Sequence, residues 1–276
     1  MKLLKISAFS DTGKGGNPAG VHLANEHPTT SEMQSIAADV GFSETAFAMP
    51  INDSWRVRYF SPETEVPFCG HATIALGAAL ASEQGAGLYS LQLNESSITV
   101  EGFVHSGRLS AALQSPPTFS RPVSTGVLST ALALFGYSQA DLDPNLPAAL
   151  VHGGANHLFI GLRSRKALAA LSYSLPAGRE FMLSNNLVTV VFAYAENNQL
   201  FHTRNPFASG GVYEDPATGA ATAALSGYLR DIAWPHGGRI DIVQGEDMGS
   251  RSLICAEFDD IKGASIRISG AAHLLP

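Results

Sequence analysis

The sequence predicts an α+β protein of two similar domains related by a pseudo-twofold, each with a mostly antiparallel sheet wrapped around a central helix. The first observation behind this prediction is an ungapped internal repeat, in which residues 69–80 resemble residues 218–229. The identities are Gly70/Gly219, Ala72/Ala221, Thr73/Thr222, Ala75/Ala224, Leu76/Leu225 and Leu80/Leu229. Because the copies lie more than half a chain length apart, two related halves explain them better than a short tandem repeat. The second observation is that strand patterns surround each copy, an order typical of α+β folds.

Length and composition fit two domains of ordinary size. A hydrophobic content of 45% and a charged content of 15% describe a folded chain that can bury a core in each half. Ser115-Pro116-Pro117 suits a domain boundary, because proline interrupts regular structure. We therefore expect one domain over residues 1–117 and a second over 118–263, with a strand in 264–276 returning to the first.

Local patterns predict the elements of the first half in order. Thr29 and Glu32 have the spacing of a capping box and Gly41 suits a helix end, so the residues between them are expected to be helical. Alternating or clustered apolar residues predict strands. The expected strands are 3–9, 20–23, 42–49, 55–60, 88–93, 97–104 and 108–113, with a loop at 11–18 and the first repeated helix after residue 69.

The second half has the same order of patterns. A helix is expected near 129–135, and the second repeated helix follows a loop through 205–207. The expected strands are 156–162, 187–194, 239–243, 252–257 and 264–269. Two helices, each among strands, are therefore expected at the centres of the two halves.

Charge and cysteine content exclude several classes of protein. The net charge is −7 and no cluster of Lys or Arg offsets it, so binding to nucleic acid or an anionic membrane is not expected. No apolar run reaches the roughly 20 residues of a membrane helix, and Lys5, Ser7 and Asp11 interrupt any signal-peptide core. With only Cys69 and Cys255, a disulfide framework is excluded, and a cytoplasmic location is expected.

The two glycines that begin the repeats, Gly70 and Gly219, predict anion binding. A helix start has unpaired N–H groups and the positive end of the dipole, and glycine lets a ligand approach closely. Two facing starts would form a cleft for a small anionic molecule. The alternative is that both glycines only allow tight packing of helix on sheet.

Glu44, His71 and Asp215 are the candidates for acid/base chemistry. Glu44 follows a helix end, and walls formed by Phe42 and Phe47 would raise its pKa by desolvation; the alternative is a solvated loop charge. His71 could reach into the cleft or make a local hydrogen bond at its helix start. Asp215 precedes a proline before the second helix, so it could cap that helix, assist catalysis or do both.

Metal and cofactor motifs are not found in the sequence. The nine histidines show no HExxH spacing and neither cysteine is in a CxxC pair, so no metal site is expected. Gly13-Lys14-Gly15-Gly16 lacks the spacing of a phosphate loop, and no dinucleotide fingerprint is present. The sequence favours chemistry without a cofactor.

Several motifs together resemble the phenazine-biosynthesis PhzF-like isomerase family. They are Gly16-Asn17-Pro18-Ala19-Gly20-Val21, Ser43-Glu44-Thr45-Ala46-Phe47, Arg58-Tyr59-Phe60-Ser61-Pro62, Glu65-Val66-Pro67-Phe68-Cys69-Gly70-His71-Ala72-Thr73 and Glu214-Asp215-Pro216-Ala217-Thr218-Gly219. The resemblance implies a diaminopimelate-epimerase-like fold with the active site between its domains, a homodimer and no cofactor.

The resemblance also implies roles for individual residues. Glu44 matches the family's acid/base glutamate, and His71 and Asp215 match residues that bind and polarise substrate. The implied substrate-binding positions are Asn17, Gly70, Thr218, Gly219 and Ala220. Two departures are the alanine at position 220, where phenazine-pathway members have a hydroxyl residue, and the segment 244–252, a variant of the family pattern.

The difference between the two repeats decides the expected chemistry. Related epimerases use a cysteine at the head of each central helix, but here Cys69 is matched by Thr218, whose hydroxyl is too weak an acid to replace a thiol. We therefore expect a cofactor-independent isomerase in which Glu44 moves a proton within a small carboxylate-bearing metabolite. The alternatives are a cysteine-dependent amino-acid racemase or epimerase and a non-catalytic small-molecule binding protein of the same fold.

Overall fold

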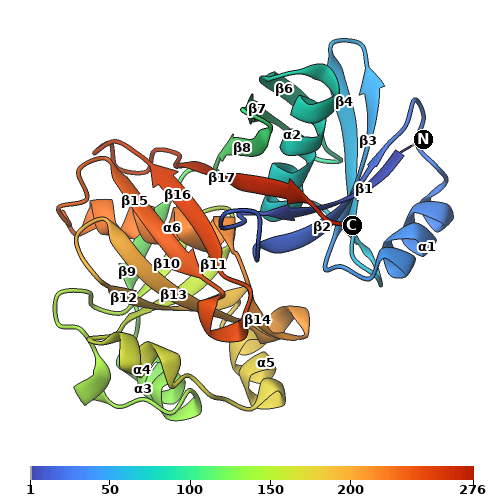
Figure 1. Ribbon diagram of the computed structural model, residues 1–276. Helices are drawn as coiled ribbons and strands as arrows, with labels where there is room; N and C mark the ends of the chain where they lie inside the picture. The colour runs from blue at the N-terminus through green and yellow to red at the C-terminus, as the bar shows by residue number, and fades with distance from the viewer. Residues whose placement is uncertain (1) are drawn as a thin grey trace. The chain divides into compact units, whose positions relative to one another are not determined.

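A computed structural model describes residues 2–276, which fall into two compact units, both drawn in Figure 1. The first unit contains the chain up to Gln114 together with Ser269–Pro276, and the second is Ser115–Ile268. Strands predominate over helices in both units. The predicted α+β class is therefore confirmed.

The first unit is built mainly from antiparallel strand pairs, with parallel pairs between β2 and β3 and between β4 and β6. Its strands are β1 (Lys2–Ala8), β2 (Asn17–Leu23), β3 (Thr45–Ile51), β4 (Ser54–Phe60), β5 (Glu65–Val66), β6 (Gly87–Gln92), β7 (Ser97–His105) and β8 (Arg108–Gln114), and its helices are α1 (Thr30–Val40) and α2 (Gly70–Gln84). The last strand, β17 (Arg267–Leu274), pairs antiparallel with β1 through residues of this unit.

Helix α2 forms the core of the first unit. Every residue from His71 to Ala81 is buried, and the helix contacts β1, β2 and β3 as well as β6, β7 and β8, among which Figure 1 shows it. The helix is apolar on all sides, as expected of a fully buried helix. A Cβ atom at Gly102 of β7 would lie 2.3 Å from the carbonyl oxygen of Gly77. The sheet therefore packs directly on the helix backbone.

The second unit has its own buried helix, α6 (Gly219–Asp231), which contacts β9, β10, β11 and β16. Its strands are β9 (Phe119–Pro122), β10 (Ala149–His152), β11 (Asn156–Gly161), β12 (Thr189–Ala195), β13 (Leu200–Phe207), β14 (Val212–Asp215), β15 (Arg239–Gln244) and β16 (Ser252–Glu257). The pairs β11–β12 and β13–β15 are parallel. A Cβ atom at Gly153 would lie 2.6 Å from the backbone nitrogen of Ala224, so this helix too is approached closely by a strand segment.

A further apolar cluster in this unit includes residues of three more helices, α3 (Thr125–Leu134), α4 (Arg165–Ala169) and α5 (Leu175–Ser184). Phe135, Phe181 and Phe192 are buried in the cluster, and their rings meet at centroid distances of 5.0–6.4 Å. Figure 1 shows these helices together at the foot of the unit. No strand or helix pattern had predicted α4 or α5.

Helix α1 confirms the prediction made from its capping residues. Thr29 is the N-cap, its side chain accepts a hydrogen bond from the Glu32 backbone, and Glu32 completes the capping box. Gly41 ends the helix in the left-handed conformation with φ of 71°, which glycine adopts without strain. The caps that define both ends of this element lie next to it in the sequence.

One expected loop is shorter than predicted and another is absent, because strand pairing overrides turn-forming residues. The loop expected at 11–18 ends early, since Asn17 already begins β2 opposite Ala8. The loop expected through 205–207 is the end of β13, where Asn205 pairs with Asp215 and the register shifts after Pro206. The final strand is also longer and later than the expected 264–269. No helix in residues 2–276 combines the length and the hydropathy needed to span a bilayer.

Candidate active site

Glu44 is held directly before β3 in the first unit. Its carbonyl oxygen accepts a hydrogen bond from the backbone N–H of Gly20 at 3.1 Å, beside the parallel pairing of Gly20 with Thr45. A Cβ atom at Gly20 would lie 2.5 Å from the Thr45 hydroxyl oxygen, so glycine permits this close approach. The side chain of Glu44 is 17% exposed. It is therefore mostly buried, unlike a solvated loop charge.

His71 lies between Glu44 and Cys69. Its Nε2 atom is 3.4 Å from Oε2 of Glu44, and its Nδ1 atom is 3.3 Å from Sγ of Cys69. The hydroxyl of Ser43 is 3.3 Å from the same Nε2. One imidazole ring thus lies within 3.4 Å of both a carboxylate oxygen and a thiol sulfur. A local hydrogen bond at the helix start does not describe His71 completely, because its ring also contacts a carboxylate from a separate element.

The start of α2 is fixed from the interior by Tyr59 and Thr73. The Thr73 hydroxyl donates to the carbonyl oxygen of Cys69 at 2.7 Å, and the Tyr59 hydroxyl lies 2.7 Å from the Thr73 oxygen. Because Thr73 has used its proton, Tyr59 is the donor to it. Burial raises the pKa of Tyr59, so this hydroxyl keeps its proton. The backbone that carries Cys69 and His71 is therefore rigidly supported.

The first residues of α2 leave room for a ligand. Cys69 is the N-cap but its side chain makes no capping hydrogen bond. A Cβ atom at Gly70 would meet nothing within 4 Å, whereas one at Gly77 would lie 2.5 Å from Val100. Tight packing therefore explains Gly77 and does not explain Gly70. An uncapped helix start with open space beside it is suited to an anionic group.

The start of α6, in the second unit, is a hydrogen-bonded network. The Thr218 hydroxyl donates to Oδ2 of Asp215 at 2.5 Å. The side chain of Gln244 donates to the carbonyl oxygen of Asp215 at 2.7 Å and to the Thr218 hydroxyl at 2.9 Å, and it accepts from the Thr218 backbone N–H at 3.1 Å. Thr218, rather than Asp215, is the N-cap of this helix.

Gln244 completes this network, and it begins the segment 244–252, to which the sequence assigns no role. It is 1% exposed at the end of β15, and it lies 26 residues after Thr218 in the chain. The next residue, Gly245, has φ of 72°, and a Cβ atom there would lie 2.7 Å from the carbonyl oxygen of Pro216. The sequence feature that could have indicated Gln244 is the glycine that follows it, because this glycine lets β15 end against the turn before α6.

The remaining candidates lie in the same two sets. Asn17 is 3% exposed at the first residue of β2. Because β2 and β3 are parallel, Asn17 and Glu44 are at the same end of their strands. Gly219 and Ala220 are the first two residues of α6, both half-buried. The structure thus brings Glu44, His71 and Cys69 together in one unit, and places Asp215, Thr218, Gly219 and Ala220 in the other.

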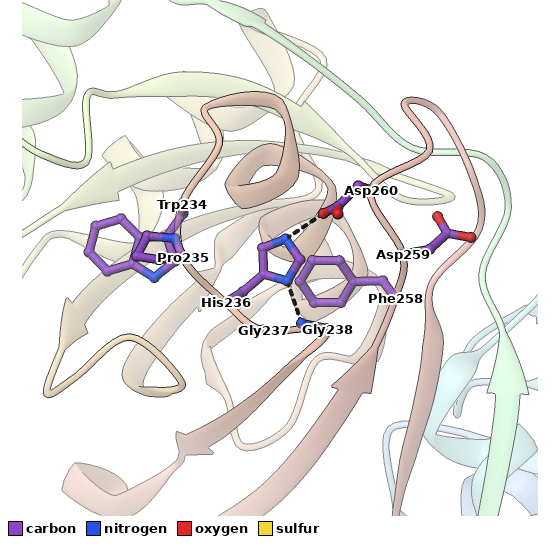
Figure 2. Close-up of a pocket in the computed structure, with 8 residues that line it drawn as sticks. All are labelled: Trp234, Pro235, His236, Gly237, Gly238, Phe258, Asp259 and Asp260. Atoms are coloured by element: carbon purple, nitrogen blue, oxygen red, sulfur yellow. Dashed lines mark hydrogen bonds and ion pairs between the residues drawn. The ribbon is translucent and has the colours of Figure 1, made fainter.

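A separate pocket of about 330 Å³ lies in the second unit (Figure 2). It is lined by Trp234, Pro235, His236, Gly237, Gly238, Phe258, Asp259 and Asp260. His236 stacks on Phe258 at 4.3 Å, its Nδ1 accepts from the Gly238 backbone N–H at 2.9 Å, and burial lowers its pKa despite Asp260. None of the predicted site residues lines this pocket. The stacking on Phe258 and the hydrogen bond from Gly238 give His236 a structural role.

Comparison with known proteins gives a match along nearly the whole chain. A family model described as phenazine biosynthesis-like protein matches residues 6–275. The chain is 31% identical over 272 residues to the trans-2,3-dihydro-3-hydroxyanthranilate isomerase of Pseudomonas aeruginosa, covering 96% of this chain and 91% of that protein.

Solved structures show the same fold. A phenazine biosynthesis protein of the PhzF family from Bacillus anthracis superposes with a TM-score of 0.85 at 21% identity, over 100% of this chain and 98% of that one. A probable proline racemase from Agrobacterium radiobacter superposes with a TM-score of 0.66 at 12% identity, over 99% and 90% of the two chains. At these identities, the structural likeness establishes the fold alone.

Proposed function

This chain belongs to the phenazine biosynthesis-like protein family, and we propose that it isomerises a small carboxylate-bearing metabolite by moving a proton without a cofactor. The relative that is 31% identical is named an isomerase, and this chain is an isomerase as well. The observation that carries the proton-transfer mechanism is the mostly buried carboxylate of Glu44, 3.4 Å from the imidazole of His71.

Glu44 is the group that moves the proton in this proposal. Its carboxylate removes a proton from one carbon of the substrate, the electron pair shifts the double bond, and the resulting carboxylic acid returns the proton to another carbon of the same molecule. A positioned acid/base group contributes about 10²–10⁴-fold to rate. His71 orients the Glu44 carboxylate by the contact at Nε2.

The start of α2 supplies the proposed site for the substrate carboxylate. Its first N–H groups are not capped by the Cys69 side chain, and the helix dipole favours a negative charge there. Asn17 and Gly70 are proposed to bind substrate in the first unit, and Asp215, Thr218, Gly219 and Ala220 in the second. Because Ala220 has no hydroxyl, it offers the substrate only its backbone.

Cysteine chemistry is the second candidate, because Sγ of Cys69 lies 3.3 Å from Nδ1 of His71. A two-thiol mechanism is disfavoured, since Thr218 stands where the second thiol would be and its hydroxyl already donates to Asp215. A mechanism using Cys69 alone would still need a second proton-transfer group. Glu44 is the group that is present, so the carboxylate mechanism is preferred.

Incorporation of solvent deuterium distinguishes these candidates. Trans-2,3-dihydro-3-hydroxyanthranilate, the compound in the relative's name, and a panel of small cyclic carboxylates are incubated with the protein in D₂O and followed by NMR. We expect exchange in the wild type and a loss of at least about 100-fold in Glu44→Gln. Glu26→Gln, which changes an exposed loop carboxylate, is the matched control. Wild-type exchange in Glu44→Gln together with a loss in Cys69→Ser would establish the cysteine mechanism instead.

A further inference from the structure

Glu44, Cys69 and His71 also form a set of possible metal ligands. One donor atom from each residue can be chosen so that all three lie within 4.8 Å of one another. The donors come from two places in the fold, the residue directly before β3 and the start of α2. Their separation in the sequence explains why no ligand spacing such as HExxH predicted them.

The distance from Nε2 of His71 to Oε2 of Glu44 is that of a tetrahedral zinc site, and the distance from Nε2 to Sγ of Cys69 is longer. With bonds of usual length, donor atoms around Zn²⁺ are about 3.3–3.6 Å apart. Nε2 of His71 is 3.4 Å from Oε2 of Glu44 and 4.0 Å from Sγ of Cys69. Metal binding would require the Cys69 side chain to move from Nδ1 of His71, where Sγ is 3.3 Å away, toward Nε2, and the contact of Ser43 with Nε2 would be released. Three protein ligands leave a fourth position for water or a ligand, as in catalytic zinc sites.

The chemistry of the three donors selects the metal. A thiolate, an imidazole and a carboxylate suit Zn²⁺ and similar divalent transition metals, whereas Mg²⁺ and Ca²⁺ require oxygen ligands. The positive end of the α2 dipole disfavours a bare cation. The thiolate and the carboxylate together carry two negative charges, which neutralise a divalent ion and remove this objection.

We propose that Glu44, Cys69 and His71 bind one Zn²⁺ ion, and that the bound ion inhibits the isomerase by occupying the carboxylate that moves the proton. Binding replaces the thiol proton of Cys69, which passes to the buffer, and involves no change of oxidation state. The inhibition rests on the proposed role of Glu44, whereas the binding itself depends only on the three side chains.

Cobalt(II) tests the binding directly, because a thiolate ligand gives Co²⁺ a charge-transfer band in the near ultraviolet and tetrahedral geometry gives it intense visible bands. The wild-type chain is titrated with CoCl₂ and then with ZnCl₂. We expect both sets of bands, saturation at one ion per chain, and their loss when Zn²⁺ displaces Co²⁺. A wild-type chain without the charge-transfer band overturns the proposal.

The two cysteines give a matched pair of variants. Cys69→Ser should remove the charge-transfer band and weaken binding at least about tenfold, whereas Cys255→Ser should change neither. If a variant folds poorly, alkylation of the cysteines in the wild type tests the proposal independently. Zn²⁺ should protect Cys69 from iodoacetamide, measured by peptide mass spectrometry, and leave labelling of Cys255 unchanged. Equal labelling of Cys69 with and without Zn²⁺ contradicts the proposal.

Deuterium exchange separates this proposal from the proposed function. One equivalent of Zn²⁺ should abolish exchange by the wild type, and a chelator should restore it. If the cobalt bands appear but Glu44→Gln keeps full exchange, the acid/base role of Glu44 and the inhibition both fail while metal binding stands. If Glu44→Gln loses exchange but the bands are missing, the function stands and the metal site is wrong.

Discussion

Each of the two core helices begins with a glycine, but the side chains around the two glycines differ. At the start of α2, His71 contacts Glu44 and Cys69, three groups that can gain or lose a proton. At the start of α6, Thr218 is held by Asp215 and Gln244 through hydrogen bonds of 2.5–3.1 Å. The first arrangement holds the groups of the proposed proton transfer, whereas the second is a network of hydrogen bonds that holds the turn before α6. A shared backbone feature therefore does not imply a shared role.

The largest effect is expected from making the first helix start resemble the second. His71→Ala places at the start of α2 the residue that α6 has at position 220. We expect kcat to fall by about 100-fold or more, because Glu44 loses its contact with the imidazole. Deuterium exchange measures this loss, with the exposed His105→Ala as control. Unchanged exchange in His71→Ala would remove the functional difference between the two starts.

A large effect on stability is expected in the middle of α2 rather than at its start. Gly102→Ala would place a Cβ atom 2.3 Å from the carbonyl oxygen of Gly77, so the strand must move away from the helix. We expect a loss of about 3 kcal/mol in the free energy of unfolding, measured with urea. Gly70→Ala, where the added atom meets nothing, should change stability by less than about 0.5 kcal/mol. Equal losses would contradict the assignment of open space to Gly70.

A smaller effect is expected from releasing the network at the start of α6. Gln244→Ala leaves the Thr218 backbone N–H without its partner at 3.1 Å. We expect a loss of about 2 kcal/mol in unfolding free energy, since a buried donor left unsatisfied costs about 1–3 kcal/mol. The metal bands of the first unit should persist in this variant. Their loss would show that the two helix starts do not act separately.

Near neutral pH the smallest effect is that of His157 on the second unit, and this effect grows as the pH is lowered. His157 is 0% exposed, and burial lowers its pKa to about 3. Between about pH 6.5 and pH 3 the unfolded chain binds this proton and the folded chain does not, so stability falls as the pH is lowered. His157 alone contributes a slope of up to about 1.4 kcal/mol per pH unit. Unfolding of His157→Gln at several pH values should show a slope reduced by about this amount, and an unchanged slope contradicts the prediction.

Local patterns in the sequence predict some elements and miss others for physical reasons. Helix α1 is predicted because its cap, its apolar spacing and its terminal glycine all lie within a dozen residues. The short strands β9, β10 and β14 are missed, because four residues give too little alternation to recognise. Asn205 and Pro206 are turn formers, but pairing with β14 holds them in a strand.

In the candidate site, too, some features are predicted from the sequence and others are not. Family motifs identify Glu44 and His71, yet nothing in the spacing of residues 44 and 71 shows that their side chains meet. Only the structure brings Oε2 and Nε2 to 3.4 Å, and only the structure adds Gln244 to Asp215 and Thr218. The expectation that no metal site exists relied on ligand spacing along the chain. Such spacing cannot detect donors that come together from separate elements.

The close approach of strand to helix at Gly77 and Gly102 has a consequence for how this enzyme can evolve. Residues 71–81 of α2 are buried, and an atom added at Gly77 would lie 2.5 Å from Val100, so enlargement there disturbs the core. At Gly70 an added atom meets nothing within 4 Å. Selection for a new substrate can therefore act on the end of the helix while the rest of it stays unchanged. The core limits where variation is tolerated, and it directs that variation to the end of the helix that carries the candidate site.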